Sequence, residues 1–74
     1  MTIYDFKALT TEQQADLAWN KGVFLMHRVE NDTKYILYQL EGIYIEFEYD
    51  AAMNELVNLK SFINPDLLDP YFEQ

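Results

Sequence analysis

The chain has 74 residues and no cysteine, and its thirteen acidic and five basic side chains give a formal net charge of -8. This length suits one domain, so we treat residues 1–74 as a single unit. The lack of cysteine excludes disulfides and thiolate metal sites, and the scarcity of Lys and Arg disfavours direct binding to nucleic acid, whose phosphates need clustered cations. Hydrophobic residues make up 50% of the chain, which predicts a folded protein rather than a disordered one.

No part of the sequence predicts insertion into a membrane or export. The uninterrupted apolar stretches are only a few residues long, whereas a membrane-spanning helix needs about 20. The first ten residues contain Asp5 and no hydrophobic run, so we expect no signal peptide. We therefore expect a soluble cytoplasmic protein with no membrane partner.

Residues 10–20 are predicted to form the first helix. Thr10 is placed to cap its start, with Gln13 three residues later as in a capping box, and Gly22 is placed to end it. An apolar face at helical spacing is expected to pack on the rest of the protein. That face consists of Ala15, Ala18 and Trp19.

From residue 23 onward, apolar and polar residues alternate with a period of two, which is typical of strands. Two-residue turns are predicted at Asn31-Asp32 and Glu41-Gly42, because Asn and Gly tolerate left-handed backbone conformations. A helix is expected after Asn64-Pro65, either kinked at Pro70 or restarted with Asp69 as its cap. The predicted strands span residues 23–30, 33–41, 43–50 and 55–62.

These elements predict an α+β domain with the order α-β-β-β-β-α. The four strands are expected to form an antiparallel meander sheet in the order 1-2-3-4, with the N-terminal and C-terminal helices packed together on one face. The loop after the third strand is expected to hold an odd number of residues, 50–54, since this register turns Val57 and Leu59 toward the core. The covered face is predicted to collect Val23, Leu25, His27, Val29, Ile36, Tyr38, Leu40, Ile43, Ile45, Phe47 and Tyr49.

Two-residue turns also fix the pairing between neighbouring strands. In the second hairpin, Leu40 is expected to lie opposite Ile43. In the first hairpin, Leu25 is expected to lie opposite Tyr38, with His27 opposite Ile36 further along. This register decides which side chains reach the opposite face of the sheet.

The opposite face is expected to stay open, because no element remains in the chain to cover it. An apolar strip flanked by carboxylates would lie there, and exposed strips of this kind are typical of interaction surfaces. The alternative is an ordinary open sheet whose large side chains shield one another and whose charges pair across strands. The candidate interface consists of Phe24, Met26, Arg28, Tyr35, Leu37, Tyr44, Glu46 and Glu48.

The sequence carries no constellation that predicts catalysis. His27 and Ser61 are the only histidine and serine, and neither lies in a nucleophile or base motif. Glu46, Glu48 and Asp50 alternate along one strand, so their carboxylates lie roughly 6.5–7 Å apart, a separation that glycosidases use. A chain of this length offers little room for a sugar cleft, however, and one histidine without cysteine excludes the common zinc sites. We expect no enzyme activity, no catalytic residue, no metal and no cofactor.

Two functions remain open. The first is a non-enzymatic acidic module that binds a protein partner or a second copy through the open sheet face, with the acidic surface matched to a basic partner. The second is a small-ligand-binding or accessory protein with a pocket between the helices and the sheet, near Trp19, His27 and Tyr38. The first predicts association that depends on salt or concentration, and the second predicts a monomer stabilised by a specific compound.

A set of short, mostly apolar motifs spans most of the chain: Phe6-x-x-Leu9, Glu12-Gln13, Gly22-Val23-Phe24-Leu25, Leu37-Tyr38, Tyr44-Ile45-Glu46, Phe62 and Pro70-Tyr71. In these motifs the chain resembles a group of small uncharacterised bacterial single-domain proteins. The resemblance implies a bacterial, single-domain, cytoplasmic protein. It carries no activity and no site residue to transfer.

Overall fold

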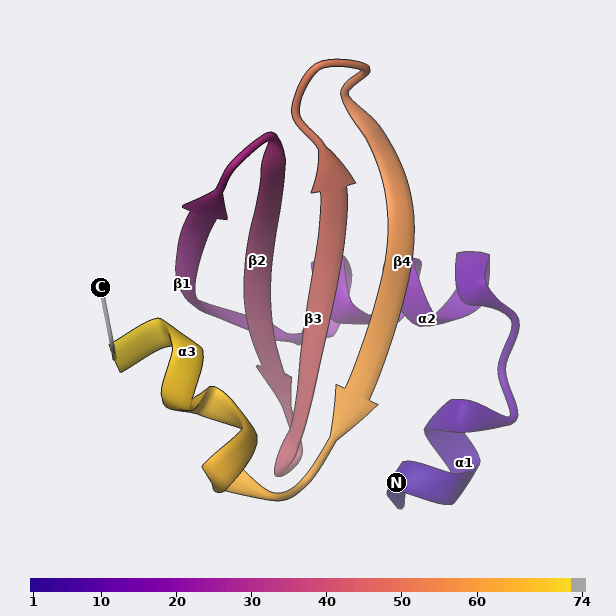
Figure 1. The fold of residues 1–74 in the computed structure, drawn as a ribbon. Helices are drawn as coiled ribbons and strands as arrows, with labels where there is room; N and C mark the ends of the chain where they lie inside the picture. The colour runs from indigo at the N-terminus through magenta and orange to yellow at the C-terminus, as the bar shows by residue number, and fades with distance from the viewer. Residues whose placement is uncertain (73–74) are drawn as a thin grey trace.

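The computed structural model describes residues 1–72. A four-stranded antiparallel sheet in the order β1-β2-β3-β4 forms its centre, with helices at both ends of the chain (Figure 1). This arrangement confirms the predicted α+β fold class and the order α-β-β-β-β-α. The elements are α1 (Ile3–Lys7), α2 (Thr11–Lys21), β1 (Val23–Glu30), β2 (Thr33–Leu40), β3 (Ile43–Asp50), β4 (Glu55–Phe62), the 3-10 helix η1 (Pro65–Leu68) and α3 (Asp69–Phe72).

Both N-terminal helices begin at a capping box. At α2 the predicted box is present, since the Gln13 N–H donates to the Thr10 hydroxyl at 3.1 Å and the Gln13 side chain accepts from the Thr10 N–H at 3.0 Å. The same reciprocal pair joins Thr2 and Asp5 at α1, a helix that the sequence analysis did not predict. These bonds satisfy donors that a helix start leaves unpaired, and α1 carries the fully buried Phe6 into the core.

The two tight turns of the sheet have the predicted conformation. Asn31 and Glu41 have φ of 57° and 48°, and Gly42 has φ of 81°, which are the left-handed values that a two-residue hairpin requires. Leu40 consequently lies opposite Ile43 and His27 lies opposite Ile36, as predicted.

A β-bulge near the start of β1 changes the predicted register. Phe24, and not Leu25, lies opposite Tyr38, and Met26 lies opposite Leu37. The expected pairing of Leu25 with Tyr38 is therefore wrong. The inserted residue shifts the side-chain alternation by one position, so Phe24 lies on the α2 face of the sheet, where its ring meets Tyr38 edge-on at 6.0 Å.

A second bulge corrects the prediction for β4. The connection between β3 and β4 has four residues, 51–54, and Asp50 pairs with Glu55. The expected five-residue loop is thus wrong, but a register shift at Glu48/Tyr49 still brings Leu59 opposite Phe47. The bulge lets Leu56 as well as Leu59 pack against the core, while Val57 is exposed.

The helices cover opposite faces of the sheet, which corrects the expectation that both pack on one face. Under α1 and α2 lies the main core, which includes Phe6, Ala18 and Phe47. Leu68 and Tyr71 of the C-terminal segment instead bury Leu37 on the other face. In Figure 1, α2 crosses behind the strands and α3 lies at their lower left. The reason is that α1 and α2 already occupy the first face, whereas the second offers an uncovered apolar strip.

Candidate functional site

The predicted interface face is occupied by the chain's own C-terminal segment. Every predicted interface residue except Phe24 lies on this face. Leu37 is fully buried and Glu46 is buried, so the expectation that this face is open is wrong. The other predicted interface residues on this face are half-buried, namely Met26, Arg28, Tyr35, Tyr44 and Glu48.

A polar cluster fixes α3 to the sheet. The Tyr71 hydroxyl donates a buried hydrogen bond of 2.7 Å to the Glu46 carboxylate. The Arg28 guanidinium carbon lies 3.8 Å from the centroid of the Tyr35 ring and 5.1 Å from that of Tyr71, which is cation-π geometry. We call Arg28, Tyr35, Glu46 and Tyr71 the Tyr71 cluster.

Burial and charge tune the ionisable groups of this cluster. Burial raises the pKa of the Tyr71 phenol, and the bond to Glu46 raises it further, because an ionised phenol would lie beside a carboxylate. Burial works against the charged form of Arg28, but its 2.6 Å ion pair with Glu30 and the nearby charge of Glu46 together leave the pKa of Arg28 raised. The phenol therefore serves as a persistent hydrogen-bond donor, which is a structural role rather than an acid-base one.

A group of exposed apolar side chains lies on the other face, around β1 and the end of α2. Trp19, Phe24 and Val29 are 50%, 52% and 59% exposed. Trp19 stacks on Phe47 with ring centroids 5.4 Å apart, and His27 stacks on Phe24 at 6.4 Å. We call Trp19, Phe24, His27 and Val29 the β1 surface.

The residues of the predicted ligand pocket share this face but pack as a row of rings. Trp19 and Tyr38 both contact Phe47, and His27 reaches Tyr38 through Phe24. Two cavities, of about 460 and 410 Å³, are lined by other residues. Sequence reasoning missed the linking role of Phe24 because the β1 bulge leaves no signal in the alternation of apolar residues.

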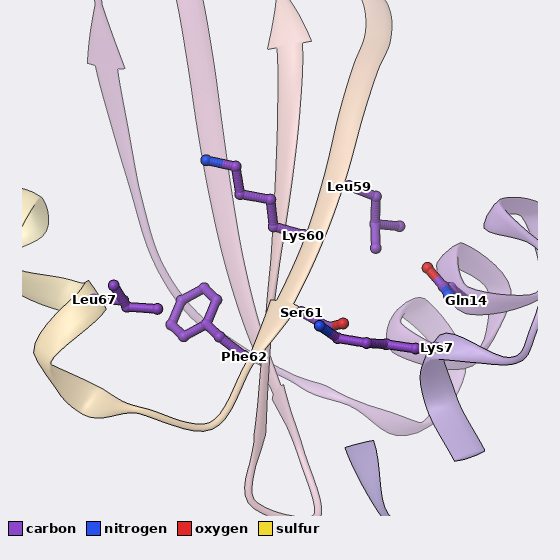
Figure 2. A pocket seen from close by; sticks show the side chains of 7 residues that line it. All are labelled: Lys7, Gln14, Leu59, Lys60, Ser61, Phe62 and Leu67. Atoms are coloured by element: carbon purple, nitrogen blue, oxygen red, sulfur yellow. The ribbon is translucent and has the colours of Figure 1, made fainter. Parts of the chain in front are cut away.

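A cavity of about 460 Å³ lies along the outer edge of β4 (Figure 2). Lys7 from α1 points toward Ser61, while Lys60 and Phe62 extend from the other side of the strand. Lysines beside an edge strand discourage the addition of another strand. The small-ligand alternative, which expected a pocket near Trp19, His27 and Tyr38, stays a prediction. The lining of the cavity at β4 is Lys7, Gln14, Leu59, Lys60, Ser61, Phe62 and Leu67, which includes no acidic residue.

Compared with protein-family models, curated proteins and solved structures, the chain shows no match. Within residues 1–72, no group of three or more His, Asp or Glu side chains is placed to share a metal ion. No helix in this described part of the chain is long and apolar enough to cross a membrane. Function therefore has to be argued from the two sheet faces and the sheet edges.

Proposed function

We propose that the chain is a non-enzymatic interaction module that binds a basic protein partner by adding one of the partner's strands to the free edge of β1. The observation that carries this proposal is the exposed, apolar character of β1 at the end of the sheet. In strand addition, main-chain hydrogen bonds supply affinity, and pockets for alternate side chains supply specificity. The proposed setting is the bacterial cytoplasm, as the sequence leads us to expect.

Beyond its bulge, the edge of β1 carries little protection against strand addition. Natural edge strands are blunted by charged side chains, especially lysine, by proline, by a bulge or by a covering element. β1 contains neither Lys nor Pro, and within residues 1–72 no backbone hydrogen bond outside the ladder to β2 involves it. Beyond the bulge, residues 26–30 pair regularly with β2, so their outer backbone groups form a straight template.

The β1 surface supplies side-chain contacts beside that template. Trp19 and Phe24 are half-exposed although each is supported by a ring beneath it. Large aromatic residues that are held rigidly and remain accessible are enriched at the energetic centres of interfaces. Apolar side chains of an added strand would lie against Phe24 and Val29 on this face.

Net charge favours a basic partner over a second copy at this edge. Two copies with a charge of -8 each repel one another, whereas a basic partner is attracted at long range and associates faster at low salt. Glu30 and Asp32 are exposed at the tip of the β1–β2 hairpin. Lysine side chains of the partner would lie beside them.

The test titrates a peptide of alternating lysine and valine into the isotope-labelled chain and follows backbone amides by NMR. We expect shifts concentrated in residues 26–30 and lost at about 500 mM salt, where exposed charges are screened. A peptide of alternating lysine and serine has the same charge and cannot bury apolar side chains, so it should bind more weakly.

Matched variants locate the binding edge. Val29→Lys places a protective charge on β1 and should weaken peptide binding by about tenfold or more. Val57→Lys makes the same change at an exposed valine of β4 and should leave binding unchanged. Shifts clustered on β4, or equal effects of the two variants, would overturn the proposal.

A further inference from the structure

Two buried side chains attach the C-terminal segment, residues 64–72, to the sheet. Leu68 and Tyr71 are each 8% exposed, whereas every other residue of the segment is exposed. They are three residues apart in consecutive helical turns, so both project toward the sheet. The attachment of the segment therefore depends on one apolar and one phenolic side chain.

The groove beneath the segment is built for this pair. Leu37 forms its floor, and Met26, Tyr35, Tyr44 and Phe62 pack around the two side chains. The buried Glu46 carboxylate accepts its hydrogen bond from Tyr71, so an empty groove would leave this carboxylate without that donor. A site with a buried polar group discriminates strongly against a ligand that lacks the matching hydroxyl. The groove thus selects a segment that carries a tyrosine.

The charges around the segment are of both signs. The segment contains Asp66 and Asp69 and no basic residue. A cavity of about 240 Å³ remains between segment and sheet, and its lining is Arg28, Glu46, Lys60 and Phe62 from the strands with Leu67 and Pro70 from the segment. The sequence that the structure shows to fit the groove is the chain's own.

We propose that this groove also accepts the C-terminal segment of a second copy, so that two chains exchange segments and form a symmetric dimer. Exchange costs little when each copy regains the contacts that it gives up. The hinge is Ile63 and Asn64, both exposed between β4 and η1, and the backbone of Asn64 is already extended. The proposal rests on other observations than strand addition at β1, although Met26 and Arg28 of β1 also lie beside the segment.

Concentration and salt control the exchange. A segment tethered by a short linker meets its own groove at an effective concentration in the millimolar range. The dimer should therefore accumulate at chain concentrations of about 1 mM, and salt should promote it by screening the repulsion between two acidic chains.

Cross-linking of single-cysteine chains tests the exchange, and the absence of native cysteine gives a clean background. Lys60→Cys and Leu67→Cys each alter an exposed residue that lines the cavity between segment and sheet. When the two variant chains are mixed at about 1 mM and oxidised, the mixed disulfide forms faster than by random collision if the segment of one chain lies in the groove of the other. We expect its yield to exceed that of a control mixture of Leu67→Cys with Lys34→Cys by about tenfold or more.

A locked chain provides the second measurement. A single chain that carries both Lys60→Cys and Leu67→Cys, oxidised when dilute, holds its segment in its own groove and should stay monomeric in light scattering at about 1 mM. Wild type at the same concentration should contain dimer. Equal cross-link yields in the test and control mixtures, or an identical mass for wild type and the locked chain, would overturn the proposal.

Discussion

Tyr71 connects the last helix to a carboxylate that the sheet buries, and this contact has an energetic consequence. Tyr71→Phe keeps the ring but removes the hydrogen bond to Glu46, which leaves a buried acceptor without its partner. We expect a loss of about 1–3 kcal/mol in the free energy of unfolding at neutral pH, measured by urea denaturation.

The same substitution should change the response to alkaline pH. The pKa of Tyr71 is raised in the folded chain by burial and by Glu46, so above the ordinary tyrosine pKa of about 10 the folded state holds a proton that the unfolded state has lost. This contribution is complete below that pH, and stability falls as pH rises through the folded pKa. Tyr71→Phe should lose stability less steeply with rising pH. Part of the decline should remain in this variant, because burial also raises the pKa of Tyr49. Tyr4→Phe, at an 81% exposed ring, is the control, and equal alkaline profiles for the two variants would contradict this account.

At the scale of elements, the junction between α2 and β1 depends on a missing side chain. A Cβ atom on Gly22 would lie 2.5 Å from the Ala18 carbonyl oxygen, which itself accepts the Gly22 N–H at 2.9 Å. Because both partners are backbone, we expect Gly22→Ala to cost about 1–3 kcal/mol through overpacking. Gly42 is left-handed with open space around it, so Gly42→Asn meets only backbone strain, which Asn tolerates better than most residues, and should cost less than Gly22→Ala. Thermal melts of the two variants check the difference, and similar melting temperatures would show that the junction can adjust.

Local chemistry accounts for most of the elements. The capping box at Thr10 and the left-handed turn residues at Asn31 and Gly42 depend on neighbours within a few positions, so they could be predicted from the sequence. Helix α1 was not predicted, although Thr2 and Asp5 have the same spacing as Thr10 and Gln13. That spacing was the signal available in the sequence. The two bulges have no such pattern in the sequence, because the position of each depends on how side chains pack against residues distant in the chain.

For the whole molecule, charge repulsion is the electrostatic feature that salt should reveal. The net charge is -8, whereas within residues 1–72 the ion pairs are those of Arg28 with Glu30 and of the N-terminus with Glu41. Added salt screens both the repulsion among the acidic side chains and the attraction within the ion pairs. Because the repulsion is larger, screening should stabilise the folded chain. We expect the melting temperature to rise between about 10 and 500 mM sodium chloride, followed by circular dichroism. A fall in melting temperature would show that the few ion pairs outweigh the repulsion.

The sequence by itself determined the class of fold, the strand order and both tight turns, because alternation and turn chemistry act over short distances. It also identified most residues of the face that now holds the Tyr71 cluster, but it assigned that face to the solvent. Only the tertiary structure decided that Leu68 and Tyr71 cover Leu37, and that apolar side chains of β1 stay exposed. The physical reason is that the helices compete for apolar area on the sheet. Because α1 and α2 fill one face, the C-terminal segment buries more apolar surface on the other face. Neither group of helices covers all of β1 at the edge of the sheet.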